Sequence, residues 1–435
     1  MLDIAIIGGG LGGLTAALRL HQAGFRPRVY ETVRDLKELG VGIVIQPYGI
    51  KEITELGLLE KLRPVSVESR ESFYFNQYGQ HIFFEKCGRF MGYDYEQRFV
   101  HRGIMQKLLY DAVVERMGQD AVVLGARCTG FSQDEKGVTV RFTSNAALNP
   151  VTEEVRADIV IGADGINSAI REQLHPQFSK PHYSGISMWR GVSLIPRYNN
   201  GGTILHIGAP GYGSMIVYPI LDNAYGTDLT LTNWVVEQNG RPESIEDWYQ
   251  KADVAEIAHM FDICKIDFID VGEMVRAAKD VWVYPLIDHD PLEQWTFGRV
   301  TLLGDAAHAM YPRGGHGACQ AYVDAGALAR CMAEMKDPLE ALQAYEQQRR
   351  PPTSRLVVAN RGDGPEVLRR IVEERTGSKP FDDIEKVLPH AEAEGILMAY
   401  HRLGGMKRPD EKAEAVGKYD SVYRREEPRV AERTK

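Results

Sequence analysis

The glycine-rich stretch near the N-terminus constrains the fold more than any other feature of the sequence. Residues 4–7 are apolar, Gly8, Gly10 and Gly13 follow as G-x-G-x-x-G, and residues 14–18 continue with the composition of a helix. In such a strand, turn and helix, the first glycine allows a tight turn, the second lets the backbone approach a pyrophosphate, and the third lets helix pack on strand. Unpaired amides at the helix N-terminus attract negative charge. The stretch predicts a dinucleotide site in a doubly wound α/β fold.

A second short strand, residues 26–31, ends on an acid at the position where a dinucleotide-binding fold holds the ribose. Glu31 lies roughly twenty residues after the glycines, as the pattern requires. A carboxylate accepts hydrogen bonds from both ribose hydroxyls and repels a 2′-phosphate. Glu31 therefore favours FAD or NAD over NADP as the bound dinucleotide.

Composition excludes several classes of protein. The 435 residues carry 51 basic and 60 acidic side chains, a formal charge of −9, which argues against a nucleic-acid partner. The five cysteines are scattered and form no C-x-x-C, which is typical of reduced thiols. The first strand leaves no room for a signal peptide, and no apolar run is long enough to span a bilayer. We expect a cytoplasmic protein with no membrane span, either a monomer or a homodimer.

Further along the chain, charged residues stand at three junctions between strands and helices. Arg102 opens a helical pattern after a strand end at residues 100–101. Asp164-Gly165 ends a strand that begins at residue 157 and is followed by Arg171, and Gly304-Asp305 ends a buried strand that begins at residue 298. Each residue also has a simpler interpretation: Arg102 as a surface charge, Asp164 as a turn acid and Asp305 as a helix cap. Residues 309–317 form a second glycine-rich loop, which opens a helix predicted over 318–335.

The remaining pattern predicts one inserted sheet and a helical C-terminal part. Residues 73–84 and 183–236 are rich in β-forming residues, whereas 244–263 and 339–350 have helical character. Pro351 and Pro352 are expected to break the second of these helices. Residues 408–435 are dense in charge and poor in apolar residues, which predicts a solvated tail.

Three motifs taken together resemble the fingerprints of the FAD-dependent aromatic hydroxylases, the class A flavoprotein monooxygenases. They are listed in chain order: Gly8/Gly10/Gly13 with Glu31, Asp164-Gly165 with Arg171, and residues 304–308 with Pro312. The segments 101–102, 189–191 and 284–288 also fit, so that the resemblance spans residues 1 to about 360. Residues 310–312 and 317–321 are most similar to the phenazine-1-carboxylate hydroxylase branch, with salicylate hydroxylase next. Ala309 and His316 depart from the usual proline and amide, which predicts a flavin site of different shape and polarity.

The resemblance implies a Rossmann-like FAD-binding domain of the para-hydroxybenzoate hydroxylase type, with an inserted β-rich substrate domain and C-terminal helices. The FAD-binding domain would comprise residues 1–72, 100–182 and 286–360. The substrate domain would comprise residues 73–99 and 183–285. Residues 361–407 would form the C-terminal helices, and residues 408–435 the charged tail.

The resemblance also implies a reaction and a role for each site residue. NAD(P)H would visit transiently and reduce FAD, O2 would add at flavin C4a, and the hydroperoxide would hydroxylate a carboxylated or phenolic aromatic or N-heteroaromatic small molecule. The residues implied in binding FAD are Gly8, Gly10, Gly13, Glu31, Arg102, Asp164, Arg171, Gly304 and Asp305. Those expected around the reactive ring are Pro312, Gly317, Ala318 and Cys319. The candidate substrate contacts are Arg190, Tyr218 and Arg313.

Several alternatives stay open at this stage. The same scaffold could carry out epoxidation, ring-cleaving hydroxylation or oxidative decarboxylation, or serve as a binding protein like the GDP-dissociation inhibitors of small GTPases. His289, His308 and His316 near Asp305 could suggest a metal, but the glycine-rich motif explains that stretch better, and we expect none. Cys319 at a helix N-terminus would have a lowered thiol pKa if exposed; the alternative is a small residue beside the flavin.

Overall fold

One of the two large sheets is a five-stranded parallel sheet that joins segments from residue 4 to residue 302. In the computed structural model, which describes residues 2–36, 41–144, 152–178, 180–210, 212–239, 250–407 and 418–423, its strand order is β19-β12-β1-β2-β8. The strands are β1 (Ile4–Ile7), β2 (Arg28–Glu31), β8 (Val122–Leu124), β12 (Ile159–Gly162) and β19 (Val300–Leu302). All four residues of β1 and of β12 are buried, as expected for strands covered on both faces.

Helices cover this sheet, and the glycine-rich turn lies at the carboxyl end of its central strand, β1. Helix α1 (Leu11–Gln22) packs against α4 (Arg102–Met117) and α9 (Gly317–Glu334). The close approach of α1 to β1 requires Gly13, because a Cβ there would lie 2.0 Å from the carbonyl oxygen of Gly8. Gly8 itself adopts φ +109°, which few side chains tolerate. The predicted strand, turn and helix unit is confirmed.

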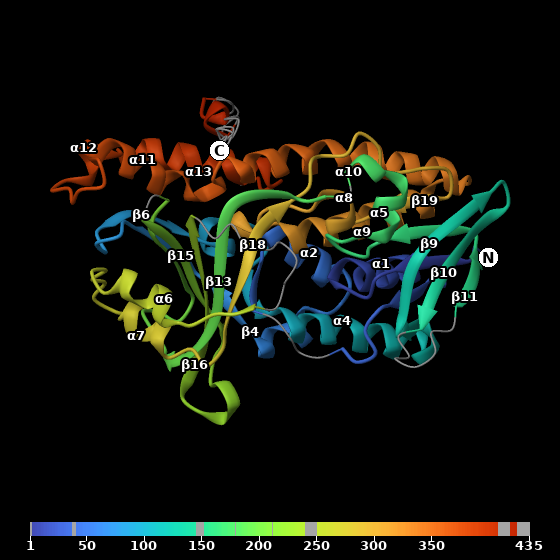
Figure 1. The fold of residues 1–435 in the computed structure, drawn as a ribbon, viewed down its shortest axis with the longest axis horizontal. Coiled ribbons are helices and arrows are strands. Elements are labelled where there is room, and N and C mark those ends of the chain that lie inside the picture. The colour runs from blue at the N-terminus through green and yellow to red at the C-terminus, as the bar shows by residue number, and fades with distance from the viewer. Residues whose placement is uncertain are drawn as a thin grey trace, which may run out of the picture.

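The second large element is an eight-stranded sheet, shown to the left of the parallel sheet in Figure 1. Its order is β17-β18-β13-β16-β15-β14-β5-β6, and every pair is antiparallel except β14 with β5. The strands are β5 (Glu71–Phe75), β6 (His81–Lys86), β13 (His182–Pro196), β14 (Thr203–Ala209), β15 (Gly213–Leu221), β16 (Leu229–Asn239), β17 (Gln250–Lys251) and β18 (Val281–Asp288). Predicted β segments 73–84 and 183–236 thus join one sheet.

One face of the eight-stranded sheet packs against short helices and the other faces a cavity. Side chains such as Leu205, Val217 and Trp234 form a core with α6 (Ala255–Ala258) and α7 (Val271–Arg276). Because successive residues of a strand point to opposite faces, their neighbours His206 and Tyr218 point the other way, and both line the cavity. The alternation of side chains along β14 and β15 therefore decides which of them face the cavity.

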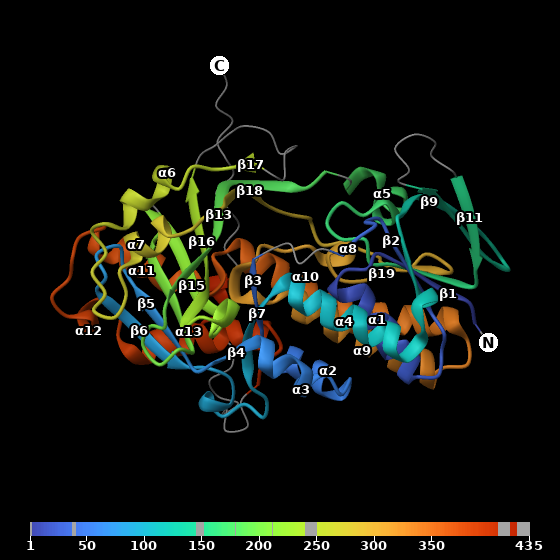
Figure 2. The same ribbon diagram turned by 90° about the horizontal axis from the view of Figure 1, so that it is seen from below.

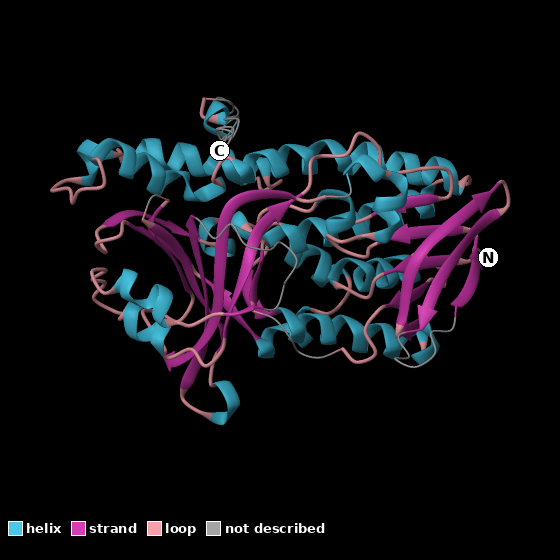
Figure 3. Ribbon diagram, in the orientation of Figure 1, coloured by secondary structure: helices cyan, strands magenta, loops and turns pink. Residues whose placement is uncertain are grey.

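Two three-stranded sheets complete the β structure. Strands β3 (Gly42–Ile45), β7 (Gln97–His101) and β4 (Ser66–Ser69) pair in the order β3-β7-β4, and Gly42 N donates to Asn233 Oδ1 of β16 at 2.8 Å. This bond ties the small sheet to the eight-stranded one. Strands β9 (Ala126–Asp134), β10 (Gly137–Ser144) and β11 (Thr152–Ala157) form the second small sheet, at the right of Figure 3.

The C-terminal helices extend over both large sheets, as the orange and red ribbons in Figures 1 and 2 show. They are α10 (Pro338–Arg361), α11 (Val367–Thr376), α12 (Ile384–Val387) and α13 (His390–Leu403). Shorter helices elsewhere are α2 (Pro47–Glu55), α3 (Leu59–Leu62), α5 (Ala169–Leu174) and α8 (Asp305–His308). Leu397 and Leu368 of the C-terminal helices join Tyr74 and Phe83 of the eight-stranded sheet in one apolar cluster. Residues 361–407 therefore form one wall over that sheet.

The prediction that Pro351 and Pro352 break a helix is wrong. Helix α10 continues through both prolines to Arg361. Residues on one side of the helix remain buried before and after them, including Tyr345, Thr353 and Leu356. Tertiary packing of this continuous buried stripe outweighs the two backbone hydrogen bonds that proline cannot donate.

The helical prediction for residues 244–263 is confirmed only in part where the structure describes it. Residues 250–251 form β17, which pairs with β18, and only Ala255–Ala258 are α-helical, with a 3₁₀ turn after them. Residues 244–249 lie outside the described residues. Pairing at the sheet edge has overridden the local helical pattern.

The predicted solvated tail is wrong for its described part, residues 418–423. Tyr423 is 2% exposed, and its hydroxyl donates to the Ile396 carbonyl at 3.0 Å. The Tyr419 ring lies so close to Gly395 that a Cβ there would be 2.3 Å from it. The rest of the charged segment, 408–417 and 424–435, lies outside the described residues. Two tyrosines thus attach the segment to α13.

We expect Tyr423→Ala to lower the free energy of unfolding by about 3 kcal/mol, because a buried aromatic ring is replaced by a cavity. Chemical denaturation of the purified protein measures the effect. Tyr225, which is 77% exposed, provides the matched control, and Tyr225→Ala should change stability little. Equal stabilities of the two variants would contradict docking of residues 418–423.

No helix in the described ranges is long and apolar enough to cross a membrane.

Candidate functional site

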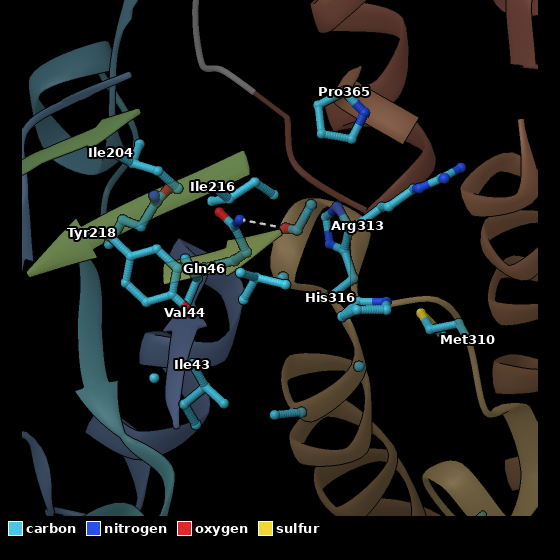
Figure 4. Close-up of a pocket in the computed structure, with 18 of the residues that line it drawn as sticks. Ile43, Val44, Gln46, Ile204, Ile216, Tyr218, Met310, Arg313, His316 and Pro365 are labelled. Carbon is cyan, nitrogen blue, oxygen red and sulfur yellow. Dashed lines mark hydrogen bonds between the residues drawn. The ribbon is translucent and has the colours of Figure 1, made fainter. Parts of the chain in front are cut away.

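One cavity connects the glycine-rich turn with the eight-stranded sheet. Its volume is about 360 Å³. At one end it is lined by Gly10, Gly12 and the first residues of α9, and at the other by side chains of β14, β15 and β16. Figure 4 shows Ile204, Ile216 and Tyr218 facing Arg313 and His316 across this space. A single space therefore joins the predicted cofactor and substrate regions.

The glycine-rich turn leaves room for a phosphate in front of α1. A Cβ added to Gly10 would meet no atom within 4 Å, although one on Gly8 or Gly13 would collide with backbone. Among the described residues, no side chain caps the N-terminus of α1, and its first turn holds no acid. Free amides, the positive end of the helix dipole and an open approach are what a pyrophosphate requires. The turn fits the phosphates of FAD.

Glu31 lies beside this turn at the end of β2. Its carboxylate accepts the Gly9 amide at 2.6 Å and the Val33 amide at 2.9 Å, which fixes its orientation. A carboxylate has about four acceptor positions, so two remain for ribose hydroxyls. The placement agrees with the predicted ribose contact, which stays a prediction.

Asp164 and Arg171 are not among the residues that line the cavity. Asp164 accepts the Ser168 hydroxyl at 2.5 Å, and Ser168 caps α5 by accepting the Arg171 amide at 2.9 Å. Burial raises the pKa of Asp164. Arg171 donates to the Ile166 carbonyl at 2.5 Å and to the Asp305 carbonyl at 3.5 Å. In this structure both residues support the loops on either side of the cofactor region.

Gly304 and Asp305 do line the cavity, and a buried network holds them from behind. Asp324 of α9 accepts the Gly304 amide at 3.1 Å, His308 Nε2 at 2.6 Å and Arg349 Nε at 2.7 Å. His308 and Arg349 keep the pKa of Asp324 low despite its burial. Sequence reasoning missed Asp324 and Arg349. The available signal was a pair of polar residues, Gln320 and Asp324, on the buried side of a helix.

The N-terminus of α9 forms a second open helix end in the cavity. Gly317 and Ala318 line it, and within the described part of the chain no side chain caps this helix and no acid lies in its first turn. Free amides there stabilise negative charge on a bound group. Pro312 also lines the cavity, but its carbonyl already accepts the Gly315 amide at 3.2 Å. The Pro312 carbonyl oxygen therefore keeps one of its two lone pairs for a ligand.

The side chain of Cys319 points away from the cavity. Its Sγ accepts the Gln46 amide at 3.2 Å and is packed against Gly49 of α2. Burial raises the pKa of this thiol to about 12. A reactive thiolate is thus excluded, and Cys319 contributes to the site only through its backbone.

The three histidines that could have suggested a metal are held separately. His308 pairs with Asp324, His289 Nε2 contacts Arg171 at 2.8 Å, and His316 Nδ1 is hydrogen-bonded to the Tyr48 hydroxyl at 2.7 Å. Burial lowers the pKa of His316 to about 3, so that it is neutral at pH 7. No group of three metal-binding side chains occurs in the described residues.

The three candidate substrate residues all line the cavity but differ in what holds them. Arg313 donates to Glu237 at 3.2 Å and to Asp363 at 3.1 Å, and these carboxylates raise its pKa. Two carboxylates therefore already neutralise Arg313, so it ties its loop to β16 and is no free anchor for an anion. Arg190 has no hydrogen bond or ion pair within the described ranges, and its Nε is buried without a partner. Tyr218 stacks on Phe99 and faces the cavity.

Arg102 opens α4, with its amide bonded to the Val41 carbonyl at 3.0 Å. Its side chain is exposed and lines the cavity between the glycine turn and β3. Arg102 is thus exposed, as its interpretation as a surface charge requires, and it also lines the cavity. Contact with the flavin stays a prediction.

This arrangement, a Rossmann-like sheet with an open phosphate turn beside a cavity on a second sheet, defines an FAD-binding oxidoreductase with a separate substrate region. Residues 1–360 match the family model described as FAD binding domain. The chain belongs to this family, whose related members are FAD-dependent aromatic hydroxylases and monooxygenases.

Curated relatives support the same family over most of the chain. Phenazine 1,6-dicarboxylic acid hydroxylase PhzS of Lysobacter antibioticus is 37% identical over 365 residues, which cover 82% of this chain and 89% of that protein. Salicylate hydroxylase of Pseudomonas putida is 29% identical, with 82% and 83% covered. The predicted resemblance to these two branches is confirmed.

Solved structures share the fold. Klebsiella pneumoniae HpxO complexed with FAD and uric acid superposes with a TM-score of 0.69 at 23% identity, covering 97% of this chain and 96% of that one. A salicylate hydroxylase substrate complex gives 0.67 at 22% identity, covering 94% and 99%. Both structural matches extend well beyond residues 1–360, the part of the chain that the family model matches.

Proposed function

We propose that this monooxygenase uses NAD(P)H and O2 to hydroxylate a planar aromatic or N-heteroaromatic carboxylate. Bound FAD supplies the transfer of electrons from NAD(P)H and the activation of O2. The chain binds the cofactor, orients the substrate and excludes water. A single parallel sheet of the Rossmann type is described, so NAD(P)H is proposed to bind transiently without a domain of its own.

The unpaired guanidinium of Arg190 carries the proposal that the substrate is an anion. Arg190 is half-buried in the cavity wall, and burial lowers its pKa because the charges nearby, Glu237 among them, offset the lost hydration only in part. A half-buried guanidinium with no ion pair to a described residue is costly, and a substrate carboxylate would neutralise it. Arg313, in the same cavity, shows the contrast, because two protein carboxylates already neutralise it.

The rest of the substrate region favours a flat apolar ring. Ile204, Ile216, Tyr218 and Val235 line it from the eight-stranded sheet, as Figure 4 shows for the first three. A mostly apolar cavity with one or two polar anchors is typical of small-molecule sites. Several relatives are named for aromatic carboxylates, among them phenazine 1,6-dicarboxylic acid, 6-hydroxynicotinate and salicylate.

Within the cofactor region, the chain's own residues would hold FAD at fixed points. The amides after Gly10 would bind the pyrophosphate, Glu31 the ribose, and Asp305 the ribityl chain. The free amides of Gly317 and Ala318 would stabilise negative charge that reduction places on the ring. The neutral His316 beside them adds no charge of its own.

Product analysis under ¹⁸O-labelled dioxygen tests the reaction. A panel of aromatic and N-heteroaromatic carboxylates is first screened for acceleration of NAD(P)H oxidation by the FAD-loaded protein. We expect the best substrate to gain one labelled oxygen atom, and poor fits to release hydrogen peroxide. Oxygen drawn from water, or turnover without dioxygen, would contradict hydroxylation. An epoxide, a cleaved ring or loss of CO2 would identify the corresponding alternative, and a purified protein without flavin would favour a binding function.

A further inference from the structure

Gln46 is a buried polar residue in the wall of the cavity. It directly follows β3, is 8% exposed and lines the cavity together with Ile216 and Tyr218 of the eight-stranded sheet. Figure 4 shows the Gln46 side chain reaching into the same space as the side chains of Ile216 and Tyr218. A polar atom of Gln46 is therefore placed to contact a molecule that fills the substrate region.

Protein atoms satisfy the backbone of Gln46 completely. Its amide donates to Cys319 Sγ at 3.2 Å. Its carbonyl accepts the amides of Gly49 at 2.8 Å and Ile50 at 3.0 Å, because Gln46 is the N-cap of α2 and Pro47 is the first residue of that helix. The backbone is thus fixed in place, and only the side chain of Gln46 can contact a ligand.

One hydrogen bond fixes the orientation of the side-chain amide. Gln46 Nε2 donates to the Gly314 carbonyl at 2.8 Å. A carbonyl accepts hydrogen bonds and cannot donate them, so the NH2 group must face Gly314 and Oε1 must face away from it. Oε1 is buried, and no donor of the described chain is bonded to it. An acceptor buried without a partner is costly, and a donor on a bound molecule would remove that cost.

The substrate region indicates which part of a substrate supplies this donor. Val235 is paired directly with Arg190 on one neighbouring strand and with Ile216 on the other, so these three side chains share one face of the sheet. A ring that lies on Val235 and Ile216 with its carboxylate at Arg190 presents its other substituents to the rest of the cavity, which includes Gln46. The donor is therefore expected on the ring and apart from the carboxylate.

We propose that Gln46 is a specificity-determining residue that accepts a hydrogen bond from a neutral N–H or O–H donor on the substrate ring. The inference rests on the proposed function and deepens it, because it narrows the substrate class to aromatic carboxylates that carry an amino, hydroxyl or ring N–H group. An acid without such a group leaves Oε1 buried and unpaired. Sites built to hydrogen-bond a substrate group reject analogues that lack this group.

Binding to the oxidised holoenzyme, without NAD(P)H, tests the inference apart from turnover. The probes are the 2-, 3- and 4-isomers of aminobenzoate, hydroxybenzoate and methylbenzoate, together with 6-amino-, 6-hydroxy- and 6-methyl-2-naphthoate. A methyl group is similar in size to an amino or hydroxyl group and donates no hydrogen bond. We expect the best-binding amino or hydroxyl acid to bind the wild-type protein about tenfold more tightly, or better, than the methyl acid substituted at the same position.

A matched pair of variants assigns this preference to Gln46. Gln46→Met removes the acceptor and keeps the length of the side chain, so the preference should fall below about threefold. Gln77 is 7% exposed and donates through Nε2 to the Ser378 carbonyl at 3.0 Å, but it does not line the cavity. Gln77→Met should therefore keep the wild-type preference. Flavin content and melting temperature report whether each variant folds, and Gln46→Leu replaces Gln46→Met if the latter does not.

The outcomes for this inference and for the proposed function differ. Amino, hydroxyl and methyl acids that bind the wild-type protein equally, or a preference that persists without Gln46, would overturn the role of Gln46 and leave the anionic substrate class intact. Loss of FAD from a folded Gln46→Met with the preference unchanged would overturn it too, because the donor would then belong to the cofactor. Failure of every acid to bind would contradict both proposals. A preference lost in Gln46→Met and kept in Gln77→Met supports the inference.

Discussion

Replacing Gly10 by valine is expected to abolish FAD binding while leaving the flavin-free protein almost as stable as the wild type. The added side chain would enter the space in front of α1, where a Cβ on Gly10 meets no protein atom within 4 Å. Gly10 has φ −75°, which valine adopts without strain. The variant should therefore show a lower flavin content and a higher dissociation constant for FAD. The free energy of unfolding of the flavin-free form should fall by less than about 1 kcal/mol.

The matched comparison is Gly13→Ala in the same turn. Its Cβ would lie 2.0 Å from the Gly8 carbonyl oxygen, so this smaller change should lower the melting temperature of the flavin-free protein as well. Ala23→Val, at the other end of α1, controls for valine near a helix end and should retain the flavin. If Gly10→Val kept a full complement of FAD, the phosphates would bind elsewhere. Fluorescence of the released flavin measures the FAD content, and thermal unfolding measures the melting temperature.

Sequence reasoning located the cofactor region because its chemistry depends on backbone. The motif of Gly8, Gly10 and Gly13 is visible in the sequence itself. Any residue with a side chain at these positions would prevent the close approach of helix, strand and phosphate. Gly304-Asp305 and the open end of α9 are short and local in the same way. Arg190 and Arg313 were predicted with equal weight as substrate contacts, and the contact of Arg190 with a substrate stays a prediction.

What the sequence did not reveal depends on contacts between distant segments. The carboxylates of Glu237 and Asp363 that neutralise Arg313 lie 76 and 50 residues from it. His206 and Glu366 are 160 residues apart, and Glu366 lies beyond the residues that the family model matches. Helix α10 passes through two prolines, and Tyr423 docks from a charged segment, because packing outweighs local preference in both. No local pattern carries such information.

The substitution with the largest expected effect on substrate binding is Arg190→Gln. Removing one partner of a buried charge pair costs about 2–5 kcal/mol, partly because the other charge is left unpaired. This corresponds to a loss of roughly 30-fold or more in affinity for the best aromatic carboxylate of the screen. The variant should keep its FAD, since the cost falls on the substrate. Titration of the oxidised holoenzyme with that acid measures the dissociation constant.

A neutral analogue shows whether the lost interaction is with the carboxylate. The primary amide of the same acid should bind wild type and Arg190→Gln within about threefold of each other, because glutamine removes a charge that the amide does not use. Arg197→Gln, an exposed cation directly after the same strand, should leave both affinities unchanged. An equal loss for acid and amide would show that Arg190 shapes the cavity and does not pair with an anion. Unchanged affinity for the acid would move the anchor to another residue, and Arg102 and Lys86, which also line the cavity, would be tested next.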